Sequence, residues 1–187
     1  YESVDIIYAV GNGPNAAVSA ARLGLKSALV SHIGDDKNGE DCLTALKEDK
    51  VITDYIETEK GKKTNYHYVL WYDVDRTILV KHTDFNYKFP NIPEASWIYL
   101  TSLAANTLPY EEEIALYLKN HPDSKLAFQP GTFQIKMGVG KLKHIYERTE
   151  IFFCNVEEAE TILEIQNKDV LTLSLGFVAL GPKMVAI

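Results

Sequence analysis

Residues 10–17 read Val-Gly-Asn-Gly-Pro-Asn-Ala-Ala, and they join a β-branched and aromatic run, residues 5–10, to an Ala-rich amphipathic segment that ends at Gly24. This order predicts a strand, a glycine turn and the start of a helix. Gly11 and Gly13 let the backbone approach a ligand closely, and the helix that follows aims unpaired N–H groups at the same space. We therefore expect a polar ligand at this turn; a tight turn without a ligand is the alternative.

The composition indicates a protein that binds a small molecule. With 187 residues and 46% hydrophobic content, the chain can bury the core of one domain with a small appendage. A net charge of -7 provides no basic face for nucleic acid, and no apolar run reaches membrane-spanning length. Cys42 and Cys154 do not have the spacing of metal ligands, and two cysteines are too few for a disulfide-stabilised fold. We expect a soluble protein of the reducing cytoplasm.

Both ends of the sequence have the character of internal segments. The sequence starts at Tyr1 without an initiator Met or a signal-peptide pattern, and residues 183–187 have the pattern of a buried strand. An α/β domain rarely ends inside a core strand. We therefore expect these residues to be part of a longer protein.

Apolar runs of strand length alternate with helical periodicity along most of the chain. Such alternation is typical of an α/β fold with a mainly parallel sheet flanked by helices. Gly24, Pro122 and Gly181-Pro182 stand where helices are expected to have ended. The expected helices are 14–23, 39–49, 109–120, 133–146, 156–164 and 168–179, and the expected strands are 27–33, 96–101, 125–129, 150–154 and 183–187.

The segment 62–84 interrupts this alternation. Residues 64–71 and 77–82 are rich in strand-forming residues and are joined by Asp-Val-Asp-Arg, which predicts a β-hairpin inserted into the α/β domain. Its aromatic side chains are expected either to pack against a partner subunit or a ligand, or simply to cover the sheet. These aromatic residues are Tyr66, Tyr68, Trp71 and Tyr72.

The glycine turn also fits a second class of protein. Gly11, Gly13 and Ala16 match the dinucleotide fingerprint, which needs an acidic residue about 20 positions later at the tip of the second strand. Asp35 and Asp36 come close to that position, but they follow another glycine, so the match is partial. A nicotinamide-dependent oxidoreductase is therefore an alternative function.

A second polar motif, Asn155-x-x-Glu158, lies directly after an apolar strand and at the start of a helix. The carboxyl edge of a parallel sheet is where ligands bind, and an Asn and a Glu there can hold hydrated Mg²⁺ and phosphate oxygens. Alternatively, Asn155 is the N-cap of the helix and Glu158 its capping-box partner.

Other polar residues have structural interpretations. The five histidines show no ligand spacing and no carboxylate partner at such spacing, so most are expected to be surface or packing residues. Residues 111–113 are three consecutive glutamates that open an expected helix, where negative charge favours the helix dipole.

These motifs, taken in order, resemble the ribokinase-like (pfkB) carbohydrate kinase family. Residues 10–24 are similar to its first signature, and residues 33–39, Ile-Gly-Asp-Asp-Lys-Asn-Gly, are similar to a loop that precedes a helix in that family. Asn155-x-x-Glu158 is similar to its Asn-x-x-Glu motif, and the hairpin 62–84 stands in the place of its substrate lid. The resemblance covers nearly the whole chain.

The resemblance implies a three-layer Rossmann-type fold in two parts. The α/β core would comprise residues 11–61 and 85–187, without the C-terminal part of the ATP site, and the β-strand lid would comprise residues 1–10 and 62–84. The aromatic content of the lid also favours a homodimer formed through it.

The resemblance also implies roles for individual residues. Gly11 and Asn15 would contact hydroxyl groups of a sugar or nucleoside, and Asn12 would line the same pocket. Lid residues from Thr64 to Tyr68, Tyr66 among them, would close over the substrate and exclude water. The cofactors would be ATP and Mg²⁺, with Asn155 and Glu158 organising the phosphates and Glu158 reaching the metal through water.

The sequence departs from the family pattern at two places. Val10 stands where the family has the first glycine of a pair, and the C-terminal signature Asp-Thr-x-Gly-Ala-Gly-Asp, which carries the catalytic base, is absent from residues 1–187. The 187 residues alone are therefore expected to be inactive, and the complete protein is expected to be an ATP-dependent sugar kinase. A non-catalytic sugar- or nucleoside-binding module is the first alternative, and the oxidoreductase is the second.

Overall fold

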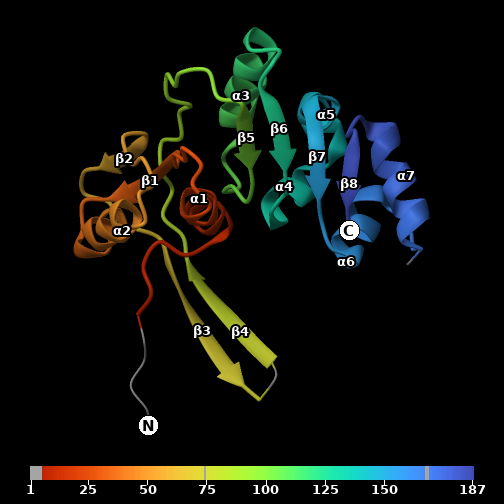
Figure 1. Ribbon diagram of the computed structural model, residues 1–187. Helices are drawn as coiled ribbons and strands as arrows, with labels where there is room; N and C mark the ends of the chain where they lie inside the picture. The colour runs from red at the N-terminus through yellow and green to blue at the C-terminus, as the bar shows by residue number, and fades with distance from the viewer. Residues whose placement is uncertain (1–5, 74, 167–168) are drawn as a thin grey trace. The chain divides into compact units, whose positions relative to one another are not determined.

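The computed structural model of the chain describes residues 6–73, 75–166 and 169–187 (Figure 1). The expected packing of the Trp71 and Tyr72 rings lies outside the described side chains. The chain divides into two compact units, Tyr1–Pro90 and Asn91–Ile187. Each unit is built from α/β elements and has its own buried residues.

The first unit contains two helices, a pair of parallel strands and a long hairpin. Strands β1 and β2 pair in parallel with Ser31 opposite Ile56, and helix α2 lies between them in the sequence. Ala17, Leu46 and Val51 form the buried centre of the unit, because the apolar faces of α1 and α2 meet there. The elements are α1 (Asn12–Arg22), β1 (Ser31–Gly34), α2 (Lys37–Glu48), β2 (Ile56–Glu59), β3 (Tyr66–Tyr72) and β4 (Asp75–Lys81).

Strands β3 and β4 form the hairpin that the sequence predicts (Figure 1). They pair antiparallel, from Tyr66 opposite Lys81 to Tyr72 opposite Asp75. Tyr68 and Leu79 are directly opposite each other and are 58% and 52% exposed. The hairpin therefore contributes little to the core of its unit.

The second unit is a four-stranded parallel sheet with the strand order β5-β6-β7-β8. Helix α3 contacts α5, and α5 contacts α7, so the helices that connect successive strands form a layer (Figure 1). The elements are β5 (Trp97–Leu100), α3 (Leu108–Asn120), β6 (Lys125–Phe128), α4 (Thr132–Met137), α5 (Val139–Arg148), β7 (Thr149–Phe153), α6 (Val156–Leu163), α7 (Val170–Leu180) and β8 (Met184–Ala186).

Aromatic rings fill the centre of the second unit. Phe152 on β7 has no exposed surface and packs edge-on against Phe128 of the neighbouring strand, with ring centres 5.7 Å apart. Phe152 also stacks on Phe177 of α7, with ring centres 4.4 Å apart. Strand and helix positions therefore meet in one continuous apolar cluster, whose burial stabilises the sheet.

The structure corrects three of the expected elements and adds one. The expected helix 133–146 is two helices, because Gly138 takes a φ of +83° and separates α4 from α5. The expected strand at residues 5–10 is wrong for residues 6–10, and residue 5 lies outside the described residues. The expected strand 27–33 begins only at Ser31, after an isolated bridge between Ala28 and Ile52. Strand β2 was not predicted.

Candidate functional site

At the glycine turn, Gly11 has the backbone geometry that the sequence predicts, whereas Gly13 lies inside α1, which begins two residues earlier than expected. Gly11 is the N-cap of α1 with a φ of +134°, a conformation that side chains other than glycine rarely adopt. Its carbonyl accepts a hydrogen bond from the Asn15 N–H at 2.9 Å. Asn12 and Asn15 are exposed, and the first turn of α1 carries no acidic residue. The turn therefore presents amide side chains and a positive helix end to solvent.

The other predicted substrate residues, Thr64 and Tyr66, differ in their surroundings. Thr64 is buried, and its hydroxyl accepts a hydrogen bond from the Gly34 N–H at 3.0 Å and donates one to Asp36 at 2.6 Å. Its hydroxyl proton is thus used inside the protein. Tyr66 is 41% exposed and packs edge-to-face with Tyr68, with ring centres 5.5 Å apart, so part of its surface is available to a ligand.

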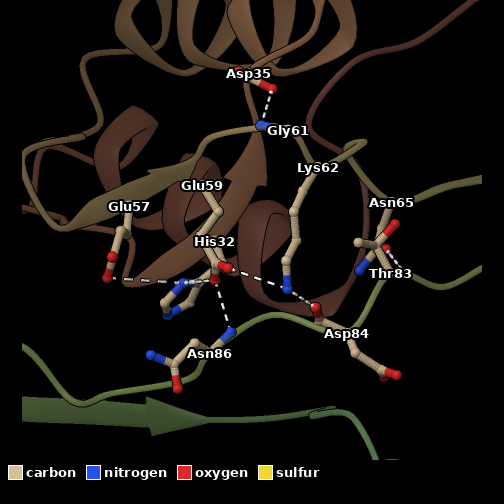
Figure 2. A network of polar contacts seen from close by, with 10 residues as sticks. All are labelled: His32, Asp35, Glu57, Glu59, Gly61, Lys62, Asn65, Thr83, Asp84 and Asn86. Carbon is tan, nitrogen blue, oxygen red and sulfur yellow. Dashed lines mark hydrogen bonds and ion pairs between the residues drawn. The ribbon is translucent and has the colours of Figure 1, made fainter.

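The chain segments that enter and leave the hairpin are held together by polar contacts (Figure 2). We call residues 59–65 the incoming root and residues 82–86 the outgoing root. The Asn65 side-chain oxygen accepts the Thr83 N–H at 2.6 Å, and Lys62 donates to the Asp84 carbonyl. Each of these contacts joins one root to the other, so both strands leave the body of the unit at a fixed separation.

Glu59 is the centre of the same network. Its carboxylate accepts the Asn86 N–H at 2.7 Å and lies 3.2 Å from the Lys62 ammonium and 3.2 Å from the His32 imidazole. Burial raises the pKa of Glu59, but the hydrogen bonds from Asn86 and Lys62 outweigh it and lower the pKa below its ordinary value. Glu59 therefore stays ionised and binds both roots.

Sequence reasoning found only part of this network. His32 is buried against Phe85 and Tyr87, as expected of a packing histidine, but its contact with Glu59 was not predicted. This contact could have been predicted only from the parallel pairing of β1 with β2, which places His32 opposite Glu57 and close to Glu59. That pairing could not be found because β2 itself was missed.

In the second unit, polar residues gather where the parallel strands end. Ser102 follows β5 and Gln129 follows β6, and the Gln129 N–H donates to the Leu100 carbonyl at 2.9 Å. The turn after β6 comes close to β5, since a Cβ placed on Gly131 would lie 2.6 Å from the Ser102 hydroxyl oxygen. Asn155 follows β7 at the same edge. This is the edge of an open parallel sheet where ligands bind.

Asn155 and Glu158 form a capping box at the start of α6. The Asn155 Oδ1 accepts the Glu158 N–H at 2.8 Å, and Glu158 Oε2 accepts the Asn155 N–H at 3.0 Å. The structural interpretation of this motif is therefore correct. The capping box leaves Oε1 of Glu158 and the amide nitrogen of Asn155 outside its own hydrogen bonds, so the same pair can also contact a ligand.

Glu111 was predicted to serve the helix dipole, but it is fully buried while its neighbours Glu112 and Glu113 are exposed. Burial raises the pKa of Glu111 to about 7, although hydrogen bonds with Gln134 and Thr107 act to lower it. The Gln134 side chain in turn accepts the Gly131 N–H at 2.8 Å. Gln134, buried like Glu111, therefore holds the turn after β6 from inside the unit.

Within residues 6–73, 75–166 and 169–187, no group of three or more His, Cys, Asp or Glu side chains is arranged to hold a metal ion. In the same part of the chain, no helix has the length and apolar character that crossing a bilayer requires.

The structure combines a glycine turn that opens a helix, a β-hairpin and a parallel α/β sheet with polar residues at its strand ends. The pfkB family carbohydrate kinase profile matches residues 7–187, and the chain belongs to that family. The resemblance stated from the sequence motifs is thereby confirmed.

Individual relatives support the same assignment. Ribokinase from Mus musculus is 26% identical over 159 residues, which are 81% of this chain and 48% of that protein. The crystal structure of a PfkB protein from Polaromonas sp. JS666 matches with a TM-score of 0.76 at 17% identity, over 91% of this chain and 63% of that one. Ribokinase from Arabidopsis thaliana, solved with ribose and ATP, matches with a TM-score of 0.72 at 17% identity, over 91% of this chain and 57% of that one.

These matches confirm the predicted fold class, a three-layer α/β fold with a mainly parallel sheet flanked by helices. The chain spans about half the length of the mouse ribokinase that it matches.

Proposed function

We propose that the complete protein is a cytoplasmic, ATP-dependent kinase that phosphorylates a hydroxyl group of a sugar or nucleoside. The observation that carries this proposal is the family match over residues 7–187, which includes the glycine turn, the hairpin and Asn155-x-x-Glu158 in one order. The Arabidopsis relative was solved with ribose and ATP, which supports a sugar and a nucleotide as the two ligands.

The first unit would bind the sugar. Gly11, Asn12 and Asn15 lie at the exposed start of α1, where amide groups and backbone N–H groups can bind hydroxyl oxygens. Tyr66 would cover the sugar from the hairpin, and Thr64 would hold the root from which that hairpin emerges. Closing the hairpin over the substrate would exclude water, which would otherwise compete as the phosphoryl acceptor.

The second unit would bind ATP and Mg²⁺ at the carboxyl edge of its sheet. The donor set fits, because Glu158 keeps one carboxylate oxygen outside the capping box and Mg²⁺ is commonly held by one carboxylate, water and phosphate oxygens. Mg²⁺ bound to ATP neutralises the charge on the transferred phosphoryl group. Asn155 would direct its amide nitrogen to a phosphate oxygen.

A kinase assay on the complete protein tests this proposal. We expect ADP to form with at least one member of a panel of pentoses, hexoses and nucleosides, and the residues 1–187 alone to bind the same substrate without turnover. A complete protein that contains the C-terminal Asp signature and phosphorylates none of them would contradict the proposal.

The first alternative is a non-catalytic module that binds a sugar or nucleoside. Sugar binding by the complete protein without ADP formation would favour it. The oxidoreductase alternative lacks the strand that its fingerprint requires before the glycines, since residues 6–10 form no strand. Binding of NADH, measured by the change in its fluorescence, would support the oxidoreductase alternative.

The hairpin is also a candidate for self-association. Val69, Ile78 and Val80 are exposed on one of its faces, and Tyr68, Leu70 and Leu79 are exposed on the other. An isolated two-stranded hairpin is at best marginally stable in water and presents free strand edges. A second copy of this chain would cover one apolar face, while the other face would remain for the substrate.

A further inference from the structure

In the turn between β1 and α2, one carboxylate contacts both a helix and the incoming root. Asp36 is the N-cap of α2 and accepts the Gly39 N–H at 3.2 Å. The same carboxylate accepts the Thr64 hydroxyl at 2.6 Å and the Thr64 N–H at 3.3 Å from each oxygen. Thr64 lies 28 residues away in the sequence and two residues before β3 begins. Asp36 thus binds a helix and the incoming root together.

The surrounding backbone is shaped to permit this contact. A Cβ on Gly34 would overlap the backbone of Lys62, and a Cβ on Gly39 would lie 2.9 Å from the Thr64 hydroxyl oxygen. The Thr64 hydroxyl also accepts the Gly34 N–H, and Asp35 accepts the Gly61 N–H at 2.9 Å. The turn and the incoming root therefore fit against each other closely on both sides of Asp36.

A second N-cap in the chain shows what an ordinary cap of this chemistry looks like. Asp169 caps α7 and accepts both the N–H and the hydroxyl of Thr172, at 2.9 and 2.6 Å. There the threonine belongs to the helix being capped. At α2 the third residue is Gly39, which has no hydroxyl, and the threonine comes from the incoming root instead. Capping alone does not require that contact.

We infer that Asp36 is a positioning residue that fixes the direction in which the hairpin leaves the body of its unit. The inference rests on the proposed function, because an aligned hairpin is what allows residues such as Tyr66 to meet a sugar. Burial raises the pKa of Asp36, but the hydrogen bonds from Thr64 and Gly39 outweigh it and lower the pKa. The carboxylate therefore stays ionised and keeps its three hydrogen bonds at neutral pH.

Three variants separate this role from capping. Asp36→Ser keeps a capping oxygen for Gly39 but is too short to hold Thr64 in the same way. Thr64→Val removes the hydroxyl and leaves the cap intact. Asp169→Ser makes the matched change at a cap whose threonine partner belongs to its own helix.

The experiment measures the direction of the hairpin without any ligand. Nitroxide labels on exposed positions of α2 and the hairpin, Lys47 and His67, report their distance distribution by pulsed electron paramagnetic resonance, with Cys42 and Cys154 replaced by Ala. We expect a broader distribution in Asp36→Ser and in Thr64→Val, no further broadening in the double variant, and none in Asp169→Ser. An unchanged distribution in both hairpin variants would overturn the inference, and Thr64→Val decides alone if Asp36→Ser does not fold.

A second measurement links the position of the hairpin to binding. If the loosened hairpin takes up its binding position about a tenth of the time, the apparent affinity for the sugar falls about tenfold. Calorimetric titration with the sugar found in the kinase screen should show this loss in Asp36→Ser and Thr64→Val but not in Asp169→Ser; equal affinities would overturn the inference. A wild-type chain that binds no sugar contradicts the proposed function, while the distance measurement still decides the role of Asp36.

Discussion

The parallel sheet β5–β8 and the hairpin β3–β4 use similar residues in opposite ways. Phe152 and Leu126 in the sheet have no exposed surface, whereas Leu70 and Leu79 in the hairpin are more than half exposed. Apolar burial supplies most of the favourable free energy of folding, so the sheet stabilises its unit and the hairpin does not. The hairpin keeps apolar surface that a partner or a ligand can cover.

The largest expected effect comes from the centre of the sheet. Phe152→Ala removes a ring that packs against Phe128 and Phe177, and we expect it to lower the free energy of unfolding by about 3–5 kcal/mol. Urea denaturation followed by circular dichroism measures the change. A loss below about 1 kcal/mol would contradict the view that this cluster stabilises the unit.

The second effect concerns a charge inside the same unit. The pKa of Glu111 is raised from 4.5 to about 7. Between these two pH values the folded state therefore keeps a proton on Glu111 that the unfolded state has released. The stabilisation by protonated Glu111 is complete below pH 4.5 and declines as the pH rises, until it is lost above about 7, a total of up to about 3 kcal/mol.

Glu111→Gln provides the matched control, because the amide is neutral at every pH. We expect the variant to be more stable than the native chain at pH 8 and to lose the decline between pH 4.5 and 7. Unfolding curves of both proteins at several pH values measure this. A native chain whose stability rises through that window, with the same slope in the variant, would contradict the assignment to Glu111.

These two predictions also show what the sequence could and could not reveal. The alternation of strands and helices in the second unit was predictable because buried parallel strands and amphipathic helices have different periods. The capping box at Asn155 and Glu158 was predictable from four residues. The burial of Glu111 was not, because it depends on Gln134 and Thr107, and only the fold brings Gln134 to α3.

The missed elements have similar physical causes. Strand β2 reads Ile-Glu-Thr-Glu, which has one apolar residue and no hydrophobic alternation. Gly138 stands inside a helical pattern, and its positive φ cannot be deduced from the periodicity around it. The network around Glu59 depends on residues that are 27 positions apart, His32 and Glu59 among them, so it was beyond local reasoning.

The third prediction tests the edge of the sheet, where a cap and a proposed ligand site share two residues. Asn155→Ala removes the N-cap of α6, and we expect a loss of about 1 kcal/mol in unfolding free energy. Glu158→Gln can keep the capping box and should change stability by less than about 0.5 kcal/mol, yet it should weaken MgATP binding. The exposed neighbour Glu157, changed to Gln, is the control for charge. Equal MgATP affinities in the two Gln variants would remove Glu158 from the proposed site.

The smallest effect on stability is expected in the hairpin, which completes the comparison with the sheet. Val80→Lys changes a side chain that is 54% exposed and lies opposite His67, on the face away from Tyr66, so we expect the unfolding free energy of the monomer to change by less than about 0.5 kcal/mol. The same change places a charge on a face proposed to meet a second copy of the chain. Light scattering should then show the variant as a monomer at concentrations where the native chain is a dimer.

Leu116→Lys, at a similarly exposed leucine on α3, is the control and should leave the dimer intact. A native chain that is monomeric at every concentration would contradict the dimer, and the exposed apolar surface of the hairpin would then be left to the substrate alone.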